Sequence, residues 1–151
     1  MIAIDTNILV YAHRSDSIFH SEAAAVVRRV AEGNEPWAIP WPCIHEFLAV
    51  ATNPRIYKPP TPVEKAIAQV EMWMAAPTLR LIGESGSYWP AVKAMVLKGQ
   101  IVGAQVHDAR VAAICKSHGV RALWSVDRDF SRMDGCPVTN PLVAGITSRR
   151  H

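Results

Sequence analysis

The sequence has little of what marks a membrane-bound or secreted protein. Its densest apolar stretches, Ala23–Val27 and Phe47–Ala51, are too short to span a membrane. The apolar beginning of the chain is interrupted by Asp5 and follows no positive leader, so we expect no secretory signal. Only three cysteines occur, without a Cys-x-x-Cys pair, which argues against a disulfide framework and against a zinc site. These absences favour a cytoplasmic protein that does not bind membranes.

What is present suffices for one compact domain. The chain has 151 residues, of which 50% are hydrophobic, so it can bury a proper core. We place a single domain at residues 1–147 and expect the polar tail, residues 148–151, to be frayed. The net charge of +3 permits a polyanionic partner without indicating one.

Short apolar runs alternate with amphipathic segments along the chain. The expected strands are Met1–Ile4, Trp37–Ile39, Leu79–Ile82, Ala122–Val126 and Val138–Thr139. The expected helices are Thr6–Tyr11, His20–Ala31, Ile44–Thr52, Pro62–Ala76, Tyr88–Leu97 and Ala104–His118. This alternation predicts an α/β fold with a short, mostly parallel central sheet flanked by helices. The active crevice of such sheets lies at the carboxyl ends of the strands.

Four acidic residues occupy unusual positions in this pattern. Asp5 and Asp127 directly follow two predicted strands. Asp108 and Glu46 lie on predicted helices, and their neighbours on the same helix face are alanine, valine and cysteine. Burying an ionised carboxylate without a partner costs several kcal/mol, so two such placements ask for a common explanation.

A metal site explains these four acids together. Repulsion among clustered carboxylates raises their pKa values, and a divalent cation removes that penalty. Mg²⁺ and Mn²⁺ prefer carboxylate oxygens and water, and no His or Cys cluster in the sequence favours a softer ion. Carboxylates around Mg²⁺ activate water and stabilise the oxyanions of phosphodiester hydrolysis. We expect Mg²⁺, with Mn²⁺ as the alternative ion.

Each acid also has an ordinary interpretation when it is taken alone. Asp5 and Asp127 are suited to capping the helix or turn that follows each of them. Glu46 and Asp108 are suited to pairing with a nearby cationic side chain. Asp129 lies two residues after Asp127, and it either faces the same crevice or caps a short helix. Only the joint placement of the acids favours the metal site.

Four segments of the chain carry these acids: Ile4–Leu9, His45–Phe47, His107–Ala113 and Ser125–Phe130. In their order and spacing they resemble the motifs of PIN-domain nucleases, most closely the VapC-type toxins of bacterial toxin–antitoxin pairs. The resemblance covers essentially the whole chain. It implies a PIN-like three-layer fold and a Mg²⁺- or Mn²⁺-dependent endoribonuclease. It also implies an RNA substrate, a small VapB-like antitoxin and a homodimer.

Carried over by position, the resemblance assigns the catalytic quartet to Asp5, Glu46, Asp108 and Asp127. Asp5, Asp108 and Asp127 would bind the metal directly, although Asp127 could also act through a bound water. Glu46 would bind metal or orient the attacking water. Asp129 is a further candidate ligand, and the choice between it and Asp127 stays open.

Other polar residues stand where the family places support for the site. Thr6 and Asn7 would support the first acid, and Ser125 keeps the hydroxyl at a position where the family often has Thr. Three arginines are candidates for phosphate contact because their sequence neighbours belong to the expected crevice. They are Arg14, Arg110 and Arg128. For each of them, an ordinary solvated or paired arginine is the alternative.

Three other functions compete with the metal-dependent nuclease. One is a non-catalytic PIN-like module that binds RNA or protein, against which the intact set of acids speaks. Another is a metal-free ribonuclease with His45 or His107 as the base, which leaves the misplaced acids unexplained. The third is a phospho-accepting module, which needs a second acid close to the nucleophile, whereas Asp5 is followed by Thr6 and Asn7.

Overall fold

The computed structural model describes residues 1–142, so the predicted domain end at residue 147 and the tail 148–151 lie outside the described residues. Five strands form one sheet in the order β3-β2-β1-β4-β5. They are β1 Ile2–Ile4, β2 Trp37–Pro40, β3 Leu79–Ile82, β4 Ala122–Trp124 and β5 Val138–Thr139. All pairings between these strands are parallel, which confirms the predicted α/β class.

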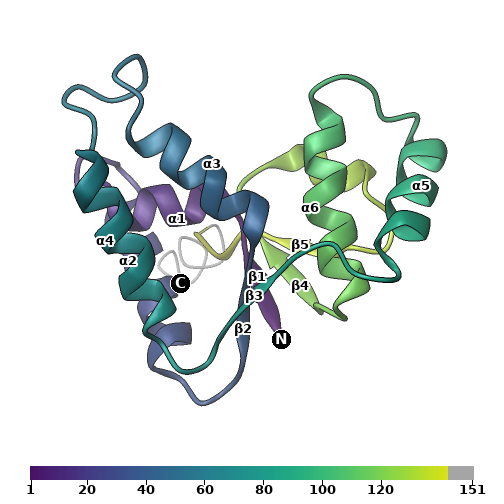
Figure 1. Cartoon of the computed structure of the whole chain (residues 1–151), viewed down its shortest axis with the longest axis horizontal. Helices are drawn as coiled ribbons and strands as arrows, with labels where there is room; N and C mark the ends of the chain where they lie inside the picture. The colour runs from purple at the N-terminus through teal and green to yellow at the C-terminus, as the bar shows by residue number, and fades with distance from the viewer. Residues whose placement is uncertain (143–151) are drawn as a thin grey trace, which may run out of the picture.

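Helices flank this sheet. They are α1 Thr6–His13, α2 His20–Glu32, α3 Trp41–Ala51, α4 Val63–Met74, α5 Tyr88–Gly99 and α6 Gln105–Ser117, with a short 3-10 helix, η1, at Arg128–Arg132. Figure 1 shows α1 to α4 gathered on one side of the strands, with α5 and α6 on the other. Within residues 1–142, none of the helices combines the length and apolarity that a membrane crossing requires.

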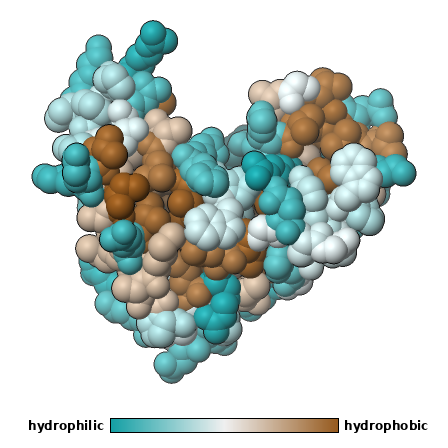
Figure 2. Space-filling view, in the orientation of Figure 1, coloured by the Kyte–Doolittle hydropathy of each residue, from teal (hydrophilic) through white to brown (hydrophobic). Residues whose placement is uncertain are grey.

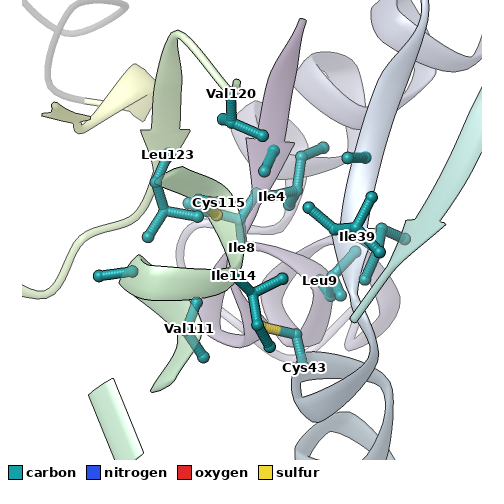
Figure 3. Close-up of a cluster of buried hydrophobic side chains, with 14 of the residues drawn as sticks. Ile4, Ile8, Leu9, Ile39, Cys43, Val111, Ile114, Cys115, Val120 and Leu123 are labelled. Atoms are coloured by element: carbon teal, nitrogen blue, oxygen red, sulfur yellow. The ribbon is translucent and has the colours of Figure 1, made fainter. Parts of the chain in front are cut away.

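The core lies where the strands meet the helices. Every residue of β1 and β2 is buried, as expected for the middle of a parallel sheet covered on both faces. Ile4, Ile39 and Leu123 of three neighbouring strands meet Leu9 of α1 and Ile114 of α6 in this core (Figure 3). The core therefore fixes α1 and α6 against the central strands, and these two helices carry site residues.

The strand β4 is shorter than predicted, because it ends at Trp124 and not at Val126. The backbone N–H of Val126 donates to the Asn7 side chain at 3.3 Å, and that of Asp127 donates to the Ser125 hydroxyl at 3.0 Å. Side chains have therefore replaced the strand ladder as partners of these backbone groups. The chain leaves the sheet here, at the carboxyl end of β4, which lies beside the carboxyl end of β1.

Candidate metal centre and active site

A pocket of about 800 Å³ opens at the carboxyl ends of β1 and β4. Residues of α1, α3 and α6 form its walls, and Figure 2 shows the hollow between α3 and α6. The acids that line it are Asp5, Glu46, Asp108, Asp127 and Asp129. The structure therefore brings all four acids of the predicted quartet, together with Asp129, into one pocket.

Asp5 is the most buried of these acids. It is 7% exposed and stands between β1 and α1, where its Oδ1 accepts from the Thr6 backbone N–H at 2.8 Å. The predicted capping role is thus present, and it coexists with a place in the pocket. Burial raises the pKa of Asp5, although hydrogen bonds from the Ser125 hydroxyl and the Thr6 N–H act to lower it.

Ser125 and Asn7 join Asp5 to the segment that carries Asp127. The Ser125 hydroxyl donates to Asp5 Oδ2 at 2.7 Å and accepts from the Asp127 backbone N–H at 3.0 Å. Asn7 Nδ2 lies 3.1 Å from the same hydroxyl oxygen and 3.4 Å from Asp5 Oδ2. These bonds fix the end of β1 against the end of β4, and through them Asn7 and Ser125 both contact the Asp5 carboxylate.

Asp108, Asp127 and Asp129 form the tightest group of acids. One carboxylate oxygen from each lies within 4.8 Å of the other two. Burial, followed by the negative charges of Asp127 and Asp5, raises the pKa of Asp108 to about 6. Asp127 also caps η1, because its Oδ1 accepts from the Asp129 backbone N–H at 2.8 Å. This cap turns the chain so that Asp129 faces the pocket beside Asp127.

Glu46 differs from its prediction. It is exposed, so the expectation that it lies buried in an apolar helix stripe is wrong. The reason is that α3 runs along the pocket wall, where Ala49, three residues later, is also exposed. The Thr6 hydroxyl donates to Glu46 Oε2 at 3.0 Å and so positions this carboxylate. Glu46 lies in the pocket but outside the group of three aspartates.

The tight group of three aspartates in this pocket fits a hard divalent cation. Within residues 1–142, none of the five acids forms an ion pair with a basic side chain. The cation partners that we considered for Glu46 and Asp108 are therefore not found there. The tight group offers three carboxylate oxygens and no sulfur or imidazole ligand. Such an all-oxygen set suits Mg²⁺ or Mn²⁺ better than a softer metal.

Two of the three candidate arginines do not line the acidic pocket. The Arg14 side chain is only 11% exposed, pairs with Asp16 at 2.6 Å and covers the Tyr57 ring, so its charge is already engaged. Arg128 is exposed at the start of η1 and does not line the acidic pocket. Arg110 lines it, while its Nε donates to a Glu84 carboxylate.

Sequence reasoning missed two aromatic residues of this pocket, Tyr11 and Tyr57. Tyr11 follows Asn7 by four residues on α1, and this helical spacing could have placed it on the same face. Tyr57 lies in the loop between α3 and α4, where no periodicity predicts the direction of a side chain. Only the folded structure reveals its place.

Comparison with known proteins identifies what the chain is similar to. The family model described as PIN domain matches residues 2–135. Ribonuclease VapC48 of Mycobacterium tuberculosis is 31% identical over 137 residues, which cover 91% of this chain and 94% of that protein. Ribonuclease VapC43 of the same organism is 31% identical over 143 residues, covering 94% of this chain and 96% of that protein.

Solved structures share the fold. VapBC2 from Rickettsia felis, bound to a promoter DNA fragment, matches with a TM-score of 0.64 at 19% identity and covers 92% of this chain and 98% of its own. Mycobacterium tuberculosis VapC20, a sarcin–ricin loop cleaving toxin, matches with a TM-score of 0.64 at 14% identity, covering 89% and 96%. These matches confirm the predicted three-layer architecture.

Proposed function

The chain belongs to the PIN-domain family, with VapC ribonucleases as its relatives, and we propose that it is a Mg²⁺- or Mn²⁺-dependent endoribonuclease. We further propose that it acts as the toxin of a toxin–antitoxin pair. One observation carries the nuclease proposal: five acids from four distant parts of the sequence line one pocket and have no basic partner among residues 1–142. A divalent cation would neutralise these carboxylates and would in turn attract an RNA phosphate.

The group Asp108, Asp127 and Asp129 would hold the cation, with Asp5 as a further ligand at the base of the pocket. A bound divalent cation lowers the pKa of water and neutralises charge on a phosphate. Asp5 is held by four hydrogen bonds, from the Thr6 N–H, the Ser125 hydroxyl, the Asn7 amide and the Cys43 thiol. This bonding keeps its carboxylate fixed while ligands enter and leave.

Glu46 is placed to handle the proton of the attacking water. Its Oε2 accepts from the Thr6 hydroxyl, and the residue is exposed where it lines the pocket. A carboxylate held in this way would act as a general base. It would take a proton as the water oxygen bonds to phosphorus, while the P–O bond to the leaving ribose oxygen breaks and that oxygen takes a proton from solvent. Arg110 lines the opposite wall and pairs with Glu84 through its Nε, so its terminal N–H groups would be the ones to contact a phosphate oxygen of the RNA.

RNA cleavage with and without metal tests the proposal. Purified protein is incubated with total RNA in Mg²⁺, in Mn²⁺ and in excess chelator, and the same is done with Asp5→Asn and Asp108→Asn. Asp134→Asn is the matched control, since Asp134 is exposed, pairs with Lys98 and lies outside the acidic pocket. We expect metal-dependent cleavage by the native protein and by the control, and none by the two pocket variants.

Two results would contradict the proposed metal-dependent nuclease. Equal cleavage by the native protein in metal and in chelator would exclude the metal mechanism. RNA binding without cleavage in either metal would favour the alternative, a non-catalytic RNA- or protein-binding module.

The toxin role implies partners beyond RNA. The relatives are named ribonucleases, and a solved neighbour is a VapBC complex on promoter DNA, which supports a small VapB-like antitoxin for this chain. We also propose a homodimer and a cytoplasmic location, the latter in keeping with three free cysteines.

Expression of the chain should stop growth, and co-expression of the product of an adjacent short reading frame should restore it. Growth unaffected by the active protein would contradict the toxin role.

A further inference from the structure

The acidic pocket has a second, apolar end. Along α1 its lining changes from Asp5, Thr6 and Asn7 to Val10 and Tyr11. Along α3 the lining changes in the same direction, from Glu46 to Ala49 and Val50, and Tyr57 of the following loop completes that end. At a rise of about 1.5 Å per residue, Tyr11 lies about 9 Å along the helix from Asp5, a separation that one nucleotide can bridge.

We propose that Tyr57, with Tyr11 and Val50, forms a subsite for the nucleobase adjacent to the phosphate that the acids cleave. This inference rests on the proposed ribonuclease function and deepens it. The acids can act on any phosphodiester, whereas the apolar end offers aromatic and aliphatic side chains that can contact a base. Tyr57 is thus a substrate-binding residue of the same site.

Tyr57 is held in place before any ligand arrives. The Arg14 guanidinium lies 4.3 Å from the centre of its ring, and the Tyr57 backbone N–H donates to the Asn53 carbonyl at 3.0 Å. Arg14 is itself fixed by Asp16 at 2.6 Å and by the Thr61 hydroxyl at 3.3 Å. Arg14 covers the ring but does not line the pocket, so a different part of Tyr57 faces the ligand space. A pre-ordered aromatic side chain loses little freedom on binding.

The charges at this end favour a base over a phosphate. Within residues 1–142, the one cation–π contact on the Tyr57 ring comes from Arg14, whose guanidinium pairs with Asp16. Tyr11 packs its ring against Phe19 with 5.2 Å between ring centres and is half-buried, so it also offers a fixed apolar surface. Burial raises the pKa of Tyr57, so the side chain stays uncharged at neutral pH and its ring offers a neutral surface. Aromatic surfaces of this kind hold unpaired bases by stacking.

A binding experiment with two changes, one on each side of the contact, tests this subsite. The probes are two short fluorescein-labelled RNAs, one intact and one with an abasic nucleotide beside the central phosphate. Their affinity for the protein is measured by fluorescence anisotropy in chelator, so that neither RNA is cut. The variants are Tyr57→Ala, Tyr57→Leu and Tyr57→Phe. The matched control is Ile56→Ala, since Ile56 is the neighbouring residue, is 52% exposed and does not line the pocket.

We expect Tyr57→Ala and Tyr57→Leu to bind the intact RNA about tenfold more weakly, the loss typical of one stacked base. Tyr57→Phe and Ile56→Ala should bind like the native protein. The abasic RNA should bind the native protein and Tyr57→Ala with the same, weaker affinity. In cleavage assays the alanine variant should raise KM and leave kcat nearly unchanged. Melting curves identify any variant that fails to fold, and the leucine variant keeps the apolar volume.

Equal affinity of Tyr57→Leu and the native protein for the intact RNA would overturn the subsite. The subsite would also be overturned if the abasic nucleotide weakened RNA binding equally in the native protein and in Tyr57→Ala. A third contradicting result would be a Tyr57 variant that binds the antitoxin more weakly and RNA with unchanged affinity. Failure of the nuclease proposal looks different: in that case no RNA is cut in any metal, whereas the dependence of binding on the base persists.

Discussion

Burial and the negative charges of neighbouring acids oppose the ionisation of Asp108. Ionised Asp108 therefore lowers the free energy of unfolding. Its pKa is about 6 in the folded protein against 3.8 ordinarily. Below the lower value it is protonated in both states. Between the two values only the unfolded state gives up the proton, so stability falls over this pH range and the loss is complete above about pH 6. Asp108→Asn should therefore stabilise the metal-free protein at neutral pH.

The expected gain is about 1 kcal/mol, since solvent around this partly exposed carboxylate screens much of the full shift. Urea unfolding in chelator at about pH 4 and about pH 8 measures it. The variant should gain at the higher pH and match the native protein at the lower. A variant less stable than the native protein at the higher pH would contradict this electrostatic account.

Ser125 connects two acids through one hydroxyl, so its loss should affect both stability and chemistry. It is 2% exposed. Ser125→Ala leaves the Asn7 amide and the Asp127 N–H without this acceptor, which should cost about 1–3 kcal/mol. It also removes a hydrogen bond that lowers the pKa of Asp5, so the acid limb of the cleavage rate should move to higher pH. Ser125→Thr keeps the hydroxyl and should preserve the profile; identical profiles for the alanine variant and the native protein would refute the role.

For single residues, the sequence predicted which acids line the pocket, but it did not predict how buried each acid is or which backbone groups it caps. The position of Asp5 after a strand predicted its place in the pocket, and the structure adds that it caps α1 at the same time. Glu46 was expected to be buried because helical spacing shows which residues share a face, but not whether that face meets the core or a pocket. Asp129 was harder to judge, since only the turn of η1 brings it beside Asp127.

Among the elements, α6 must end sharply because β4 begins a few residues later. Gly119 follows its last turn with φ +69°, and the Val120 N–H returns to the Cys115 carbonyl at 3.0 Å. A Cβ at Gly119 would meet no atom within 4 Å, so the cost of Gly119→Ala is one of backbone conformation alone. We expect a loss of about 1 kcal/mol in urea unfolding.

Gly86→Ala is the control for that prediction. A Cβ at Gly86 also meets nothing within 4 Å, and its φ lies outside the left-handed region. The free energy of unfolding should therefore stay close to the native value. An equal effect of both substitutions would show that the left-handed turn after α6 is not the cause.

Element boundaries followed local signals where these existed. Glycines and prolines predicted most helix ends, whereas α3 begins at Trp41, three residues earlier than expected. Pro40 is extended and Pro42 fits a first helical turn, so the helix starts directly after β2. The end of β4 depends on bonds to the side chain of Asn7, a residue far away in the sequence, and no local pattern near Val126 contains that information.

For the whole molecule, the fold class was predictable and the strand order was not. Alternating elements imply a parallel sheet, but the order β3-β2-β1-β4-β5 depends on which crossovers pack best. That order makes β1 and β4 neighbours, and so joins Asp5 to Asp127 across the sequence. It also leaves Tyr57 at the far end of the pocket, where no sequence signal pointed.

Divalent cations should stabilise the whole protein if they bind only its folded state. At about 100 times Kd, Mg²⁺ would add about 2.7 kcal/mol to the free energy of unfolding. We expect Mg²⁺ to raise Tm for the native protein and for Asp134→Asn, and to leave Asp108→Asn unchanged. A similar rise in all three would indicate a general salt effect and not a specific site.

The most direct test of the shared acidic site is a Mn²⁺ titration followed by electron paramagnetic resonance, since the signal of free Mn²⁺ falls as the ion binds. The native protein and Asp134→Asn should deplete free Mn²⁺ to the same extent, and Asp108→Asn and Asp127→Asn should leave it in solution. Equal depletion by the native protein and both pocket variants would contradict the claim that these acids hold one cation.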